Sequence, residues 1–172
     1  IVMRATTELV DGVWQGACYP FREGLATGIL AVEFSDKGYL VTGGTNRGWP
    51  VRGNRKYLLQ RLEWTGSVPF DVHSISARKT GFEVKFTKPV DKQTATDVEN
   101  YKMRSFTHIF QKFYGSPEVD ETFPKVTSAT PSPDGNSVTI TVSGLVEGHV
   151  QHGVHVAREL ARGLFGRAVP EA

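Results

Sequence analysis

The feature of this sequence that most constrains its fold is a series of short β patterns, each of which ends at a turn signal. In the clearest pattern, Val138, Ile140 and Val142 alternate with threonines, and residues 131–135 (Pro-Ser-Pro-Asp-Gly) form a strong turn before it. Similar patterns lie at residues 29–34, 39–42, 57–64, 68–77, 82–86 and 126–130. Short strands with turn residues between them predict an all-β fold of antiparallel strands.

A stretch rich in glycine and asparagine, residues 43–54, separates two of these predicted strands. It holds four glycines, two asparagines and one proline, a composition typical of a long, sharply folded loop. Arg47, Trp49 and Arg52 on this loop are candidate ligand-binding residues. The alternative is that Trp49 fills the edge of a core, since tryptophan is usually largely buried.

The patterns divide the chain into two β regions and a tail. Residues 1–66 are expected to form a small antiparallel meander, in which residues 14–24 are a loop and residues 29–34 a strand buried on both faces. Residues 67–157 are expected to form an immunoglobulin-like β-sandwich without paired cysteines, with a helical turn at 95–100 and a loop at 114–121. Residues 158–172 are expected to be a short helical or disordered tail, because two glycines weaken a helix there.

Composition excludes several classes of function. The net charge is +2 and the 20 basic residues are scattered, which argues against nucleic acid as a partner. No apolar run approaches the roughly 18 residues of a membrane span, so no membrane partner is expected. No signal-peptide pattern is visible. The single cysteine, Cys18, rules out an internal disulfide.

Two groups of residues suggest metal chemistry. His149, His152 and His155 are spaced three residues apart and are candidate transition-metal ligands. In a strand, His149 and His155 would lie about 20 Å apart, too far for one ion. In a helix two of them would meet, but glycine and valines make a helix poor here, so exposed histidines on a strand are the simpler interpretation.

The second group is acidic. Glu118, Asp120 and Glu121 supply hard oxygen ligands suitable for Ca²⁺, although their spacing matches no EF-hand and a solvated loop is the alternative. Carboxylate pairs also act as acid and base in glycoside cleavage, which makes Asp120 a catalytic candidate. His149 is a second candidate, as a base at neutral pH. No G-x-S-x-G motif for a serine nucleophile is present.

Several longer motifs resemble the C-terminal part of bacterial quinoprotein sugar-dehydrogenase-like proteins. They lie at residues 16–24, 43–50, 59–66, 86–91, 114–120 and 144–150. In that family a β-propeller is followed by an immunoglobulin-like domain and often by a c-type cytochrome. The resemblance implies that residues 1–66 are a last propeller blade, that residues 67 to about 157 are the domain after it, and that the parent is secreted or periplasmic.

This sequence departs from the family in three ways. The other propeller blades that would build a quinone site are missing from it, and so is a Cys-x-x-Cys-His haem motif. After residue 150 the family pattern gives way to a segment rich in arginine, alanine and glycine, and its last dozen residues are expected to be foreign to the fold.

The expected function is therefore a non-catalytic β module that binds carbohydrate or a partner domain and requires no cofactor. Its apolar blade face predicts a homo-oligomer, and Trp64 and Phe70 are expected to be buried between the two regions. The alternative is a small stand-alone metal-dependent hydrolase, a lactonase or glycosidase, that uses Ca²⁺ or a transition metal. The sequence does not specify a substrate for it.

Overall fold

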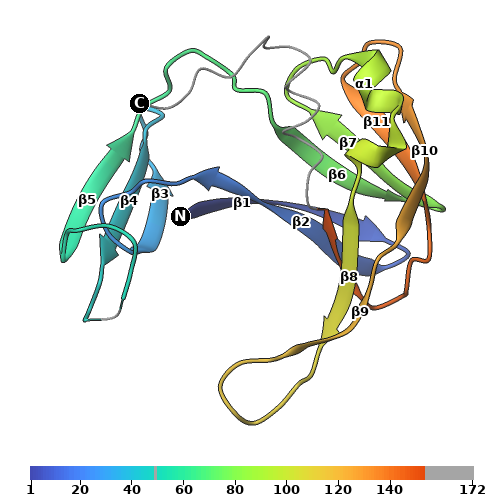
Figure 1. The fold of residues 1–172 in the computed structure, drawn as a ribbon. Coiled ribbons are helices and arrows are strands. Elements are labelled where there is room, and N and C mark those ends of the chain that lie inside the picture. The colour runs from blue at the N-terminus through green and yellow to red at the C-terminus, as the bar shows by residue number, and fades with distance from the viewer. Residues whose placement is uncertain (49, 154–172) are drawn as a thin grey trace. The chain divides into compact units, whose positions relative to one another are not determined.

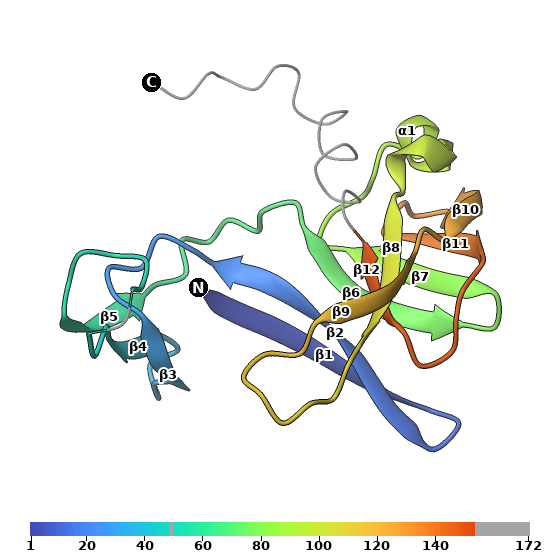
Figure 2. The same cartoon turned by 60° about the horizontal axis from the view of Figure 1, so that its bottom comes forward.

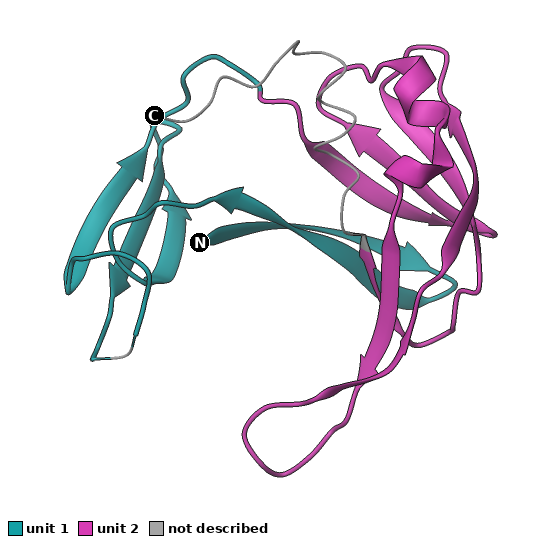
Figure 3. Cartoon of the chain, in the orientation of Figure 1, with its two compact units in different colours: residues 1–68 teal, residues 69–172 magenta. Residues whose placement is uncertain are grey.

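The computed structural model describes residues 1–48 and 50–153, and it is an all-β structure with very little helix. The strand pairs in this part of the chain are antiparallel. The predicted all-β fold is confirmed. The chain divides into two compact units, residues 1–68 and residues 69 onward (Figure 3). Trp49, His155 and the predicted tail at 158–172 lie outside the described residues.

The first sheet of unit 1 is a long hairpin of β1 (Val2–Val10) and β2 (Val13–Arg22), drawn in blue in Figure 1. Asp11 and Gly12 connect the strands with φ of 49° and 82°, the positive angles that a tight two-residue hairpin turn requires. The prediction of a loop at residues 14–24 is wrong for most of that range. The glycine, proline and charged residues of this segment are not typical of a strand. The segment is nevertheless a strand, because it pairs with β1.

The second sheet of unit 1 consists of β3 (Ile29–Phe34), β4 (Leu40–Thr45) and β5 (Tyr57–Leu62), with β4 in the centre. The predicted loop at 43–54 therefore begins later, since Gly43 and Gly44 are ladder residues. Gly44 allows a close approach of backbones instead of a turn. A Cβ atom there would lie 2.0 Å from the carbonyl oxygen of Gly28.

The core of unit 1 is small. Val2, Leu25 and Leu40 form its buried cluster, and Ile29 and Leu62 pack against this cluster while partly exposed. The expectation that residues 29–34 are buried on both faces is wrong, because Leu30, Val32 and Phe34 are exposed. β3 is an edge strand, and the small cluster does not extend over these three side chains.

Unit 2 contains two sheets. The four-stranded sheet has the order β10 (Lys125–Pro131), β11 (Ser137–Ser143), β7 (Gly81–Phe86) and β6 (Val72–Arg78). The three-stranded sheet has the order β12 (Val150–Gly153), β8 (Met103–His108) and β9 (Glu118–Thr122). Buried side chains come from both sheets, among them Val84, Val138 and Ile140 of the first and Phe106 of the second.

The connection between β7 and β8 carries the only helices of the described residues. These are α1 (Lys92–Thr96), which lies beside β10, and a 3-10 turn at Val98–Asn100 (Figure 1). The helical turn predicted at 95–100 thus begins three residues earlier and has two parts. Asp91 caps α1 by accepting a hydrogen bond from the Thr94 backbone N–H at 2.8 Å. Neither helix is long and apolar enough to cross a membrane.

Trp64 and Phe70, which lie near the boundary of the units, were expected to be buried. Trp64 is exposed, and the ring of Phe70 stacks on Phe86 of its own unit with centroids 5.5 Å apart. Their burial between the units stays a prediction.

The loop predicted at 114–121 is wrong from Glu118 onward, because β9 begins there and pairs with β8.

Candidate functional site

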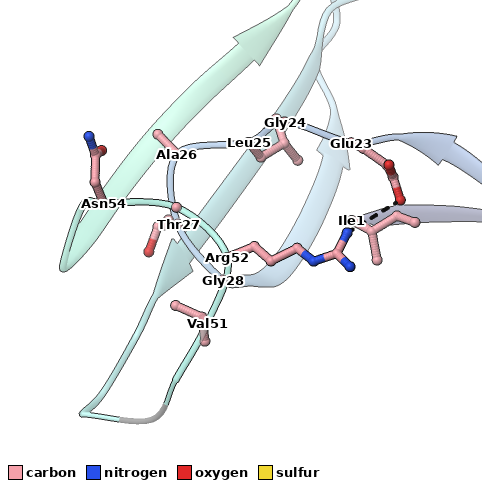
Figure 4. Close-up of a pocket in the computed structure, with 11 residues that line it drawn as sticks. Ile1, Glu23, Gly24, Leu25, Ala26, Thr27, Gly28, Val51, Arg52 and Asn54 are labelled. Atoms are coloured by element: carbon pink, nitrogen blue, oxygen red, sulfur yellow. Dashed lines mark ion pairs between the residues drawn. The ribbon is translucent and has the colours of Figure 1, made fainter.

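A pocket of about 990 Å³ lies within unit 1 (Figure 4). One wall is the segment at residues 23–28 that connects β2 to β3, and the other is residues 51–54 of the glycine- and asparagine-rich loop. Ile1 completes the lining. Segments that are distant in the sequence therefore meet at this pocket.

Two hydrogen bonds to the backbone of Ala26 hold the first wall against Arg55, which follows the second wall, and against β5. The Arg55 N–H donates to the Ala26 carbonyl oxygen at 2.9 Å, and the Ala26 N–H donates to Gln60 Oε1 at 2.8 Å. Gly53 has a φ of 104°, and a Cβ atom on it would lie 2.4 Å from the Ala26 carbonyl. The glycine is therefore required where the walls touch, which explains part of the unusual composition of this loop.

The polar groups of the pocket come from both walls. Arg52 Nη1 lies 3.8 Å from Glu23 Oε1, and both side chains are exposed (Figure 4). An exposed ion pair of this length contributes little to stability, so both groups remain able to contact a ligand. Asn54 adds an amide, while Leu25 and Val51 supply apolar lining.

The structure brings together only part of the predicted ligand-binding set. Arg52 lines the pocket, whereas Arg47 is not among the lining residues. The Arg47 backbone N–H donates to Thr45 Oγ1 at 3.2 Å, and its φ of 43° lies in the left-handed region. Trp49 is outside the described residues. Glu23 was missed because it lies far from the loop in the sequence.

The acidic candidates are engaged with an arginine. Arg104 Nη1 donates to Glu118 Oε2 at 2.7 Å and to Glu121 Oε1 at 2.9 Å. These hydrogen bonds, first to Glu118 and then to Glu121, raise the pKa of Arg104 above its ordinary value. The guanidinium also lies 4.4 Å from the centre of the Phe106 ring. It therefore occupies carboxylate oxygens that a bound Ca²⁺ would need.

Asp120 lies between these two glutamates on β9 and has a φ of 54°. Aspartate tolerates this left-handed conformation better than most residues, since its short side chain hydrogen-bonds locally. Nothing in the described contacts brings Asp120 together with His149, the other catalytic candidate.

His149 belongs to a partly buried polar cluster around Ser105 that the sequence did not reveal. Its Nδ1 lies 3.2 Å from Ser105 Oγ, and Gln151 Nε2 donates to the same hydroxyl at 3.0 Å. Ser105 is fully buried, so its hydroxyl has no access to a substrate in this structure. This serine and histidine therefore join β8 to the start of β12. His152 is exposed on β12, and His155 lies outside the described residues.

Within residues 1–48 and 50–153, no three histidine, cysteine or acidic side chains lie close enough together to hold a metal ion. The chain matches no protein-family model, no curated protein and no solved structure. Its class is therefore defined by its own architecture, an all-β chain with two antiparallel units and a pocket in the first. Membership of the quinoprotein sugar-dehydrogenase-like family stays a prediction.

Proposed function

We propose that the protein is a non-catalytic β module whose first unit packs against a partner domain. The observation that carries this proposal is that the sheet β3-β4-β5 exposes large apolar side chains on both of its faces. Soluble monomers seldom leave such surfaces uncovered.

The register assigns the exposed residues to opposite faces. Phe34 pairs directly with Leu40, so it lies on the face that carries the buried cluster, yet it is 72% exposed. Leu59 pairs with Gly43, which lies three residues after Leu40 on β4. Because successive residues of a strand alternate between its two faces, Leu59 points to the face opposite that of Leu40. Leu59 is 76% exposed. The sheet therefore has an incompletely covered face on each side.

This pattern supports a propeller-blade-like role for unit 1. In a β-propeller each sheet is stacked between two others, so both faces need apolar side chains. A blade usually has four strands, and this sheet has three. The small cluster of Val2, Leu25 and Leu40 would leave the isolated sheet marginally stable.

The strand order supports an immunoglobulin-like identity for unit 2. With β6, β7 and β8 as strands A, B and C, and β9 as C′, the strands β10, β11 and β12 are D, E and F. The two sheets then have the orders D-E-B-A and F-C-C′. These are the orders of immunoglobulin domains, in which a further strand G lies beside F. We infer that unit 2 is a supporting domain of this type.

The partner of the first unit is a further apolar sheet surface, and a second copy of the chain supplies one. Light scattering on the full chain should therefore show a dimer or larger species at high micromolar concentration. The double substitution Phe34→Ser with Leu59→Ser should shift the mass to that of a monomer. Leu9→Ser, an equally polar change at an exposed site of β1, is the matched control. A monomeric wild-type protein, or a double variant that associates as the wild type does, contradicts the proposal.

A second candidate function, binding of carbohydrate, rests on the pocket. Glu23, Arg52 and Asn54 offer the charged and amide groups that hydrogen-bond sugar hydroxyls, beside an apolar lining. Saturation-transfer NMR against a panel of neutral monosaccharides tests it. Binding should fall about tenfold or more in Arg52→Ala, the usual scale of a charged hydrogen bond. Arg47→Ala, on the same loop but outside the pocket, should bind as the wild type does, and equal losses in both variants would count against the pocket.

The metal-dependent hydrolase ranks below these two. Its Ca²⁺ candidates Glu118 and Glu121 already bind Arg104, and His149 contacts a buried serine. No contact among the described residues favours lactone or glycoside cleavage. The secreted or periplasmic origin of the parent also stays a prediction.

A further inference from the structure

The connection between β8 and β9, residues 109–117, is a second exposed apolar surface that the proposed function does not use. We call it the hairpin tip. Figures 1 and 2 show it projecting beyond the strands of its own unit. Phe110 is 100% exposed and Phe113 79%, and Ile109 and Tyr114 are also exposed.

The hairpin tip is folded by its own polar groups. The Ile109 backbone N–H donates to the Pro117 carbonyl oxygen at 3.1 Å, and Gln111 Nε2 donates to the Gly115 carbonyl oxygen at 2.7 Å. At its base, His108 Nδ1 lies 3.1 Å from the Ser116 carbonyl oxygen. The amide and imidazole are therefore directed at the loop, while the aromatic rings face solvent.

This division limits what the hairpin tip can bind. A carbohydrate needs several free donors and acceptors for its hydroxyls, and the Gln111 amide of the tip is already engaged by the Gly115 carbonyl oxygen. The tip instead offers four large apolar side chains held by a fixed backbone. Such a surface gains free energy wherever it leaves water, without directional polar contacts.

The charges of the hairpin tip favour one apolar partner. Lys112 is the only charged residue between His108 and Glu118. Of the three carboxylates that follow the tip on β9, those of Glu118 and Glu121 are paired with Arg104, and the exposed Asp120 lies between them. A lysine among aromatic residues suits a lipid interface, since its apolar stem stays with the rings while the ammonium reaches phosphate headgroups. Tyrosine also favours that interface.

The sequence-based expectation of no membrane partner rested on the lack of a spanning segment, and surface insertion of a loop needs none. We propose that the hairpin tip inserts into the interface of a lipid bilayer, with Phe110 and Phe113 entering the acyl boundary and Lys112 contacting headgroup phosphate. A single small loop makes this association weak and reversible, comparable to the marginal binding that one acyl chain provides. The attraction is mainly apolar, so salt should weaken it only slightly.

Vesicle co-sedimentation of the full chain tests the proposal. Vesicles of phosphatidylcholine alone, and with added phosphatidylglycerol, are titrated to millimolar lipid at low and high salt. The wild type should sediment with both. Phe110→Ser with Phe113→Ser should weaken binding at least about a hundredfold, since the transfer of each ring out of water changes the affinity by at least about tenfold. Phe123→Ser, an exposed phenylalanine of the same unit outside the tip, should bind within about twofold of the wild type.

Equal thermal midpoints for the three proteins show that the substitutions leave the fold intact. Wild-type protein that stays in the supernatant with both vesicle types overturns the proposal and leaves a protein surface as the occupant. Binding that requires phosphatidylglycerol, disappears at high salt and survives the tip substitutions also overturns it, because scattered basic residues then account for the attraction.

Discussion

The hydroxyl of Tyr101 donates a hydrogen bond to the backbone carbonyl oxygen of Ala95 at 2.7 Å. Both residues are buried. Ala95 lies in α1, and Tyr101 precedes β8, so the bond joins the helix to the start of the three-stranded sheet. Burial raises the pKa of Tyr101 well above its ordinary value, and the nearby charge of Asp97 raises it further.

This shift predicts a loss of stability at alkaline pH. The tyrosine keeps its proton in the folded state at pH values where it is ionised in the unfolded state. Its contribution is therefore complete below the unfolded pKa of about 10 and falls as pH rises above that value. Urea unfolding between pH 8 and 11.5 should show a steeper decline for the wild type than for Tyr101→Phe.

At neutral pH, Tyr101→Phe should cost about 1–2 kcal/mol, because the Ala95 carbonyl loses its buried donor. Tyr114→Phe is the control, since Tyr114 is fully exposed and should change neither quantity. Parallel declines for the wild type and Tyr101→Phe above pH 10 would show that Tyr101 does not carry the effect.

A second pH effect is expected in acid, at the turn between β10 and β11. Asp134 accepts hydrogen bonds from Ser132 Oγ at 2.5 Å and from the Asn136 backbone N–H at 3.1 Å. With a third bond from the Asn136 side chain, they lower the pKa of Asp134 to about 2. Because the pKa of Asp134 is lower in the folded state than in the unfolded state, its carboxylate stabilises the fold at pH values above the unfolded pKa. This contribution is lost as pH falls from about 4 towards 2.

The measurement is the thermal midpoint of wild type and Asp134→Asn across pH 2 to 6. The asparagine variant should have the smaller acid dependence, since it cannot take up the proton. Asp36→Asn, at a turn of unit 1, is a comparison for the general loss of a carboxylate. An acid slope that Asp134→Asn leaves unchanged would assign the effect to other carboxylates.

The sequence predicted strands where one face is buried, and failed where pairing alone defines the strand. Val138, Ile140 and Val142 alternate because one face of β11 packs into the interior, and they are buried as that alternation requires. β2 shows no such alternation in composition, since its strand character comes from pairing with β1 across the turn at Asp11. Local pattern carries no information about such a partner.

The candidate site shows the same limit. Arg52 could be chosen from the loop that carries it, but Glu23 became its neighbour only through the packing of the pocket walls. The link of Arg104 to the acidic residues, and that of Ser105 to His149, join residues that are separate in the sequence. In each case a residue that was a candidate metal ligand makes a contact within unit 2 instead.

These contacts predict how the acidic segment responds to Ca²⁺. In the wild type the Arg104 guanidinium competes with the ion for the oxygens of Glu118 and Glu121. Calorimetric titration should therefore detect no binding below about millimolar Ca²⁺, the weak end of protein calcium sites. Arg104→Ala should bind more tightly than the wild type, because it frees both carboxylates. Arg78→Ala, which removes the ion pair with Glu83 elsewhere in unit 2, is the control. Tight binding by the wild type would restore the calcium hypothesis.

The last prediction concerns adjacent glycines of β4 with opposite packing. A Cβ atom on Gly44 would lie 2.0 Å from the Gly28 carbonyl oxygen and 2.8 Å from Thr27 Cγ2. On Gly43 its nearest contact would be Leu59 Cδ2 at 3.2 Å. Leu59 is exposed and can move, whereas the Gly28 backbone lines the pocket and cannot yield without shifting a wall.

Gly44→Ala should therefore destabilise unit 1 by about 1–3 kcal/mol, the usual cost of overpacking a close contact. Gly43→Ala should lie within about 1 kcal/mol of the wild type, since lost freedom of the unfolded chain offsets a small side-chain adjustment. Hydrogen exchange resolved by unit is the measurement, with the amides of β3, β4 and β5 losing protection only in Gly44→Ala. The strands of unit 2 serve as the internal reference. Equal losses from both substitutions would mean that backbone approach at Gly44 does not set the packing of this sheet.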